Sequence, residues 1–267
     1  DIVSKRDLIT TCGHDISKLY GLKIRTRTAV INASILPKMI QTADMTGISV
    51  KQAHISAPLM IMRCDGGVMN VEEVKSRPIL TILSGPAAGV AGALMYEKIS
   101  EGIFLEVGGT STDISTIHNG QVMVSYAEVG GHKTYVNSLD IRTVGIAGGS
   151  MIRISQNGIV DVGPRSAHIA GLHYITYVKP EELGELRFVT IRPKSDDFND
   201  YVAIEDVTHN KRYALTLTCA ANASGYVNES HHAKGYSQSA KKAFKALAEH
   251  LSMKYDEVLE QVHEKAA

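Results

Sequence analysis

The stretch Phe104–Thr116, FLEVGGTSTDIST, has the pattern of a sharp turn between two β-strands. An apolar run enters the turn and an alternating run leaves it, with two glycines and three hydroxyl residues between them. Glu106 precedes the glycines and Asp113 follows the hydroxyls, so each arm of the predicted hairpin carries an acid. Glycine lets the backbone turn sharply and approach a ligand closely. The stretch therefore predicts a turn that a ligand can reach.

The composition of this turn is that of a phosphate site. Successive amides in a glycine-rich turn can form a concave anion site, and Thr110, Ser111 and Thr112 would add hydroxyl donors. Mg²⁺ prefers one or two carboxylates together with water and phosphate oxygens, and Glu106 and Asp113 can both lie near the tip of the hairpin. A plain polar hairpin is the alternative interpretation of the stretch taken alone.

Two further stretches are rich in glycine. Ser84–Gly89, SGPAAG, joins a predicted strand to a predicted helix, whose N-terminus would favour an anion. Val144–Ser150, VGIAGGS, is a second glycine turn. Close packing of a small-residue helix on a sheet explains the first stretch equally well, and a β-bulge explains the second.

Composition and charge exclude several classes of function. Lys plus Arg and Asp plus Glu both number 28, so the formal net charge is zero, which argues against general binding to nucleic acid or anionic membranes. The chain has no Trp and 4 Phe among 267 residues, so base-stacking platforms are scarce. We expect no nucleic-acid partner and no membrane partner.

The cysteines and the apolar runs indicate the compartment. The 3 cysteines are far apart in the sequence, which favours a reducing environment without a disulfide framework. No apolar run approaches the roughly 20 residues that cross a bilayer, and no signal peptide opens the chain. We expect a cytoplasmic protein. Because the sequence begins at Asp1 without Met, we also expect a piece of a longer one.

The periodicity predicts an α/β protein. Apolar residues recur at helical spacing over Thr26–Met45, with a kink expected at Pro37 and a stop at Gly47. The run RPILTIL is predicted as a strand. Beyond Gly102 short strands follow closely, and Asn-Gly pairs at 119–120 and 157–158 predict hairpins. Residues 186–218 are predicted as mostly β, and the chain becomes helical after residue 225.

Four stretches in this order carry a family resemblance: MRCDGGVMN, RPILTILSGPAAGVAGA, FLEVGGTSTDIS and LDIRTVGIAGGSM. Together they resemble the hydantoinase A / 5-oxoprolinase family, which includes N-methylhydantoinase A and ATPase subunits of acetone and acetophenone carboxylases. The resemblance covers residues 26–164. It implies the actin–sugar kinase–Hsp70-like (ribonuclease H-like) ATPase fold, in which an Asp-x-Gly-Gly-Thr turn from each of two lobes grips ATP phosphates around Mg²⁺. A Gly-Gly turn holds the adenosine.

The resemblance implies roles for both glycine turns. The first turn would contact phosphate, with the two acids near Mg²⁺ or the attacking water. The second would line the adenosine, with its first glycine shaping the turn. The implied cofactor-binding residues are Gly108, Gly109, Thr110, Ser111, Thr112, Gly145, Gly148, Gly149 and Ser150, and the implied catalytic and metal-binding residues are Glu106 and Asp113.

The chain departs from the family pattern at several positions. Glu106 stands where the family usually has Asp, which displaces the carboxylate by about one bond length. The adenosine turn has Ile146 and Ala147 where the family has Ala and Gly, and Arg142 stands where a His is common. The sequence beyond Ala167 diverges. No first Asp-x-Gly-Gly-Thr turn lies upstream, so the resemblance covers the second lobe alone.

We therefore expect an α/β ATPase second lobe over 1–180, with a β-rich module and C-terminal helices over 181–267. The implied function is ATP-dependent hydrolysis, in which ATP activates a cyclic amide substrate. The implied partners are the small-molecule substrate, the missing N-terminal lobe and a hydantoinase B-like subunit. A carboxylase subunit, a small-molecule kinase, and a nucleotide-binding or assembly module without chemistry of its own are the alternatives.

Overall fold

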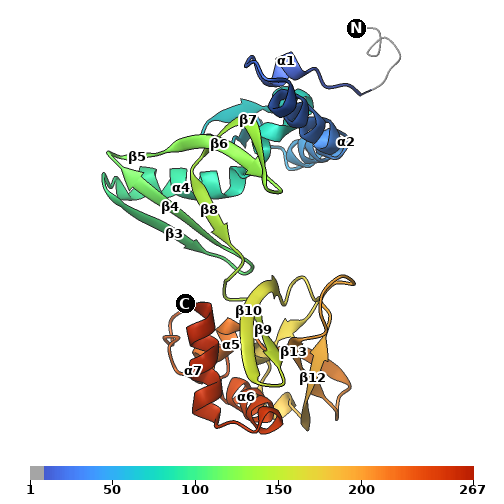
Figure 1. The fold of residues 1–267 in the computed structure, drawn as a ribbon, viewed down its shortest axis with the longest axis vertical. Helices are drawn as coiled ribbons and strands as arrows, with labels where there is room; N and C mark the ends of the chain where they lie inside the picture. Colours follow the sequence, from blue (N-terminus) through green and yellow to red (C-terminus); the bar gives the residue numbers. More distant parts are fainter. Residues whose placement is uncertain (1–8) are drawn as a thin grey trace. The chain divides into compact units, whose positions relative to one another are not determined.

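The computed structural model describes residues 9–267, which form a mixed α/β protein (Figure 1). The chain divides into two compact units. Unit 1 comprises the residues up to Glu106 together with Asp113–Arg142, and unit 2 comprises Val107–Thr112 and Thr143–Ala267. The chain therefore leaves unit 1 at one end of the first glycine turn and returns at the other. The sequence-based division at residue 180 stays a prediction.

Unit 1 is built around a long helix and three small sheets. Helix α2 is one continuous helix of 31 residues. The predicted kink at Pro37 does not interrupt the helix. The predicted stop at Gly47 is wrong, because the helix ends at Gln52. Relative to alanine, a proline inside a helix lowers helix stability by about 3 kcal/mol and a glycine by about 1 kcal/mol. Packing outweighs that cost, since Ile31 and Ile35 contact a buried cluster. The helices of unit 1 are α1 (Gly13–Ile16), α2 (Leu22–Gln52), α3 (Val71–Ser76) and α4 (Ser84–Glu97).

The strand predicted in RPILTIL is also wrong. The residues Pro78–Thr81 form a 3₁₀ helix instead. Pro78 has no N–H for a strand ladder, and the Thr81 hydroxyl donates to the Pro78 carbonyl at 2.8 Å. The Ile79 N–H donates to Oδ1 of Asn32 at 3.1 Å, which fixes the turn to helix α2.

The four-stranded sheet carries both arms of the first glycine turn, while β1 pairs with β2 and β6 with β7 in separate sheets. Strand β4 is the neighbour of β3, β5 and β8, and α4 packs on this sheet through a cluster that includes Val90, Ile117 and Val122 (Figure 1). The predicted Asn-Gly hairpin is confirmed, with Asn119 and Gly120 at φ of 52° and 70° between β4 and β5. The strands are β1 (Met60–Met62), β2 (Val68–Asn70), β3 (Gly102–Val107), β4 (Thr112–His118), β5 (Gln121–Val122), β6 (Val124–Val129), β7 (His132–Leu139) and β8 (Ile141–Val144).

Unit 2 has a larger sheet with three helices packed on it (Figure 1). Its strand order is β10-β9-β13-β14-β11, and β12 also pairs with β13. The hairpin predicted at Asn157-Gly158 and the later strands and helices are confirmed. Phe244 and Leu247 of α6 and Val262 of α7 are fully buried in the core.

The remaining bounds are β9 (Ser150–Ser155), β10 (Gly158–Ser166), β11 (His173–Tyr174), β12 (Leu186–Ile191), β13 (Tyr201–Asp206), β14 (Lys211–Ala214), α5 (Leu217–Ala223), α6 (Ser237–Leu251) and α7 (Tyr255–Ala266). Short 3₁₀ helices cover Ile175–Tyr177 and Pro180–Glu182. Within residues 9–267, no helix combines the length and the apolar character that spanning a membrane requires.

Candidate functional site

The two glycine turns are joined to each other by backbone hydrogen bonds within unit 2. Gly148 N–H donates to the Gly108 carbonyl at 3.3 Å, and Gly149 N–H donates to the Gly109 carbonyl at 3.0 Å. A Cβ added to Gly149 would overlap the Gly109 carbonyl oxygen. Glycine at 149 is therefore required for this close approach, and the structure brings together two stretches that are far apart in the sequence.

Hydroxyl groups fix the two turns in place. The Thr112 hydroxyl donates to the Ile146 carbonyl at 2.6 Å, and the Thr110 hydroxyl lies 3.0 Å from the hydroxyl of Ser166. The Ala147 N–H donates to the Ser150 hydroxyl at 2.9 Å. Thr110, Thr112 and Ser150, each expected to contact the cofactor, thus hold the protein backbone or another side chain.

The first turn keeps its amides open. Gly108 N–H closes the turn by donating to the Ser111 carbonyl at 3.0 Å. Among the described residues, the N–H groups of Gly109, Thr110 and Ser111 donate to no backbone carbonyl. Gly109 is exposed, and a Cβ added there would meet nothing within 4 Å. Three successive donors in an open turn form the kind of concavity that binds an anion.

Thr218 and Tyr174 lie against the second turn, and the sequence analysis missed both. Thr218, in α5, donates from both its N–H and its hydroxyl to the Gly148 carbonyl, at 2.8 Å each. A Cβ added to Gly149 would overlap the Tyr174 hydroxyl. Burial raises the pKa of the Tyr174 phenol, as do the nearby Cys219 and Tyr177, so the hydroxyl keeps its proton as a donor. Neither residue stands in a glycine-rich motif, and no local signal marks them.

An apolar cavity of about 370 Å³ adjoins the second turn. Gly148 lines it together with apolar side chains from α5 and the segment after it, and Thr112 and Thr218 supply its hydroxyls. Cavities that bind flat ligands are largely apolar with a few placed polar groups. The lining residues are Val107, Thr112, Ile146, Ala147, Gly148, Leu217, Thr218, Ala221, Val227, Ala233 and Ala266.

The two acids belong to unit 1. Asp113 is 9% exposed at the start of β4, whereas Glu106 is exposed near the end of β3. The Glu106 side chain lies against α4 at Gly89. A Cβ added to Gly89 would overlap Oε2 of Glu106 and lie 3.1 Å from its Cδ.

The donor chemistry of these acids fits Mg²⁺. The described residues contain no group of three His, Cys, Asp or Glu side chains that could hold a metal ion by themselves. Mg²⁺ does not need such a group, because it binds through one or two carboxylates and takes its other ligands from phosphate and water. Glu106 and Asp113, which flank the turn in the sequence, offer hard oxygen ligands of that kind.

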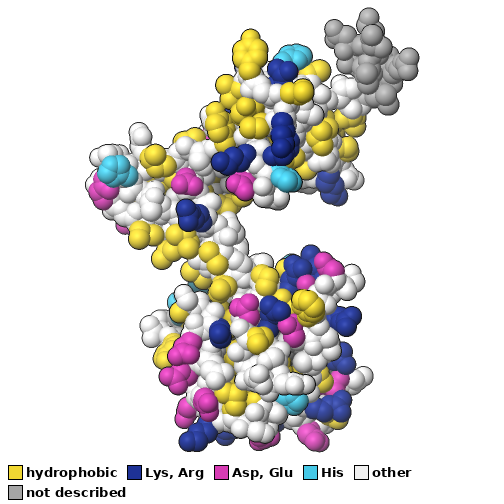
Figure 2. Space-filling view, viewed as in Figure 1, with side chains coloured by type: hydrophobic (Ala, Val, Ile, Leu, Met, Phe, Trp, Pro, Cys, Tyr) yellow, Lys and Arg dark blue, Asp and Glu magenta, His cyan; other side chains and the backbone are white. Residues whose placement is uncertain are grey.

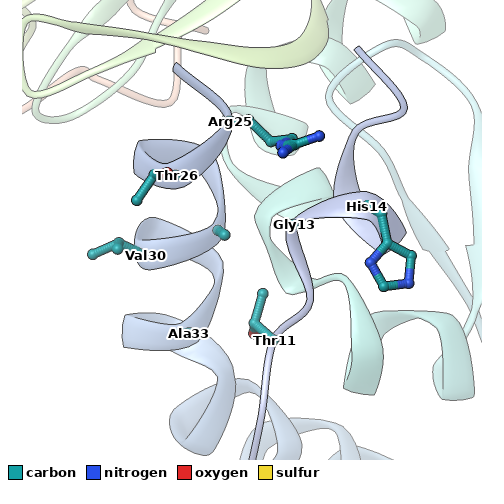
Figure 3. Close-up of a pocket in the computed structure, with 8 residues that line it drawn as sticks. Thr11, Gly13, His14, Arg25, Thr26, Val30 and Ala33 are labelled. Carbon is teal, nitrogen blue, oxygen red and sulfur yellow. The ribbon is translucent and has the colours of Figure 1, made fainter. Parts of the chain in front are cut away.

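A larger cavity lies elsewhere in unit 1. Figure 3 shows this cavity of about 520 Å³, between the Thr11–His14 segment and the first turns of α2. His14 and Arg25 are its ionisable side chains. None of the residues predicted for the site lines it, so its size does not make it the candidate site.

Comparison with known proteins places the chain in a family. The structure defines a mixed α/β protein in which two glycine turns are joined by backbone hydrogen bonds. The hydantoinase/oxoprolinase family model matches residues 25–267, so the chain belongs to this family. The family includes ATP-dependent enzymes that act on cyclic amides.

Three relatives give the range of this similarity. The chain is 27% identical to caprolactamase subunit alpha of Pseudomonas jessenii over 60% of this chain and 24% of that one, and 32% identical to 5-oxoprolinase of Saccharomyces cerevisiae over 57% and 12%. The solved ATP-dependent caprolactamase superposes with a TM-score of 0.63 at 22% identity, over 95% of this chain and 33% of that one.

A nucleotide-free acetone carboxylase superposes with a TM-score of 0.65 at 19% identity, over 92% of this chain and 31% of that one. These solved structures confirm the mixed α/β fold. The chain thus spans a third or less of the length of each of these relatives.

Proposed function

We propose that this chain is the second lobe of an actin-like ATPase within an ATP-dependent hydrolase of cyclic amides. The open amides of Gly109, Thr110 and Ser111 carry the proposal, because they offer three donors to a phosphate group in one turn. The apolar cavity beside Gly148 would take the flat face of the adenine base. The named relatives that act on lactams favour a cyclic amide over other substrates.

In this proposal the residues of the chain divide the work. The open amides bind phosphate oxygens, while Glu106 and Asp113 hold Mg²⁺ or orient the group that attacks the phosphate. Bound Mg²⁺ would neutralise phosphate charge during transfer, a reaction in which the protein contributes mainly positioning and electrostatic stabilisation. Thr218 supports the second turn, because both of its hydrogen bonds hold Gly148 at the edge of the base cavity.

The complete enzyme would need further parts. We propose that an N-terminal lobe supplies the first phosphate turn, and that a hydantoinase B-like subunit completes the hydrolysis of the activated amide. We also propose a cytoplasmic location, because Cys12, Cys64 and Cys219 are all free thiols.

Exchange of one acid tests the proposal. In the full-length protein, Asp113→Asn should abolish ATP turnover and leave the circular dichroism spectrum unchanged, because it removes the charge but keeps the shape of the side chain. Asp140→Asn, an isosteric change at an exposed position between β7 and β8, is the matched control and should keep turnover. Wild-type turnover in Asp113→Asn would overturn the role of this acid.

A carboxylase subunit is the second candidate, favoured by the similarity of fold to acetone carboxylase. Bicarbonate dependence distinguishes the two functions. A hydrolase should consume ATP with a lactam in bicarbonate-free buffer, whereas a carboxylase should consume ATP only when bicarbonate and a ketone are both present. Nucleotide binding without turnover under either condition would instead indicate an assembly module.

A further inference from the structure

The flank of α4 is bare where the Glu106 side chain reaches it. Phe104 and Glu106 alternate with Leu105 along β3, and both approach Gly89 from the same face of the strand. Beyond its own helix backbone, the described atoms nearest to a Cβ on Gly89 are Oε2 and Cδ of Glu106 and Cζ of Phe104, the last at 3.4 Å. The absence of a side chain at Gly89 is therefore what leaves room for this carboxylate.

The length of the acid matters to this contact. An aspartate is one methylene shorter, so its carboxylate would end near the present position of the Glu106 Cδ. A Cβ on Gly89 would lie 3.1 Å from that point, a tight contact that a small shift relieves. Oε2 is the far end of a flexible, exposed side chain, so a Cβ on Gly89 would be accommodated by moving the glutamate carboxylate to another rotamer.

From this geometry we propose that Gly89 is a positioning residue for Glu106. The bare helix flank leaves room for the carboxylate of the longer acid, and a Cβ at position 89 would displace a glutamate at 106 more than an aspartate. This inference rests on the proposed function, in which Glu106 serves the Mg²⁺–nucleotide complex. Gly89 touches neither phosphate nor metal in this scheme and acts only through the carboxylate.

A double-mutant cycle in the full-length protein tests the pairing. Gly89→Ala should reduce ATP turnover by about 10- to 100-fold, because a misplacement of about 1 Å in a catalytic group has that order of effect. In the Glu106→Asp background, the same Gly89→Ala change should reduce turnover by less than about 2-fold, since the shorter acid does not reach the new methyl group.

A second readout does not depend on turnover. Mg²⁺ titration of the ADP complex by calorimetry should show weaker Mg²⁺ binding in Gly89→Ala than in the wild type, and a much smaller effect of this change in the Glu106→Asp background. Gly92→Ala, in the same helix, is the matched control, because a Cβ there would meet nothing within 4 Å. Its turnover and Mg²⁺ affinity should equal those of the wild type.

The outcomes separate the inference from the proposed function. Equal losses from Gly89→Ala in both backgrounds would overturn the inference, because they would assign Gly89 a packing role independent of the acid. No loss from Gly89→Ala, with turnover abolished by Glu106→Ala, would overturn the inference and leave the proposed function intact. Wild-type turnover in Glu106→Ala would overturn both the inference and the proposed role of this acid.

Discussion

The two units of the chain bury their apolar side chains to different degrees. The main core of unit 2 draws on all three of its α-helices and its central strands, whereas unit 1 divides its core between two smaller clusters. Among the described residues, 18 of the 26 exposed large hydrophobic side chains belong to unit 1. Figure 2 shows a group of them over strand β3. Unit 2 therefore gathers its apolar side chains in a larger core, while unit 1 leaves more of them exposed.

The largest effect is expected in the core of unit 2. Phe244→Ala should lower the free energy of unfolding by about 3–5 kcal/mol, because it removes a fully buried ring and leaves a cavity. Urea unfolding followed by circular dichroism measures the change. Lys245→Ala, at the next and exposed position of α6, should change stability by no more than about 0.5 kcal/mol. Similar effects of the two substitutions would contradict a single cooperative core.

Asn32 is a buried polar residue of unit 1 that links several segments. The Asn32 side chain donates to the Ser76 carbonyl and the Thr11 hydroxyl and accepts from Ile79 N–H, so it ties three segments to α2. Asn32→Leu should cost about 1–3 kcal/mol for buried groups left without partners.

The control for this substitution is Ser34→Ala on the same helix. The exposed Ser34 hydroxyl bonds only to the carbonyl of Ile31 in its own helix. Urea unfolding should show little change in Ser34→Ala. If Asn32→Leu were as stable as the wild type, the hydrogen bonds of Asn32 would make no net contribution to the stability of unit 1.

The sequence predicted those parts of the fold that local chemistry determines. The Asn119-Gly120 pair forms its hairpin because both residues readily adopt positive φ. The C-terminal helices follow from their amphipathic spacing. Helix α2 could not be predicted in full, because packing far from Pro37 and Gly47 outweighs their local cost.

The candidate site also has a part that the local sequence predicts and a part that depends on distant contacts. The sequence marked both glycine turns, since glycine patterns are visible locally. It could not show that the N–H groups of Gly148 and Gly149 donate to carbonyls of the first turn, because these hydrogen bonds join residues that are distant in the sequence. For the same reason the hydroxyl partners Ser166 and Thr218 were missed.

A smaller, pH-dependent effect is expected at Asp206 in unit 2. Burial opposes charge on this carboxylate, but hydrogen bonds from Gly184 N–H and from His209 outweigh burial and hold the pKa of Asp206 below its ordinary value of 3.8. A lowered folded-state pKa stabilises the protein above the unfolded-state pKa, and that contribution disappears as pH falls through the folded-state value.

Asp206→Asn should therefore destabilise the protein at pH 7 and matter less as the pH is lowered below about 4. Urea unfolding of both proteins across this range measures the difference. His209→Ala removes one of the stabilising hydrogen bonds and should give a smaller effect of the same sign. A difference between wild type and Asp206→Asn that stays constant down to the lowest pH would contradict the lowered pKa.

The smallest effect should come from the exposed face of β3. It tests whether the apolar side chains of unit 1 that the structure exposes are exposed in solution. Ile103 is 68% exposed, so Ile103→Thr, which keeps a β-branched side chain, should change the free energy of unfolding by no more than about 0.5 kcal/mol. Ile117 on the neighbouring strand is 2% exposed, and Ile117→Thr would place a hydroxyl in the core under α4.

Urea unfolding should therefore separate these two chemically identical substitutions, with a loss only at Ile117. Ile103→Thr should also reduce self-association, which sedimentation velocity measures, because it removes exposed apolar surface. Equal losses of stability at both positions would mean that Ile103 is buried in solution, and unit 1 would then cover its apolar surface as fully as unit 2 does.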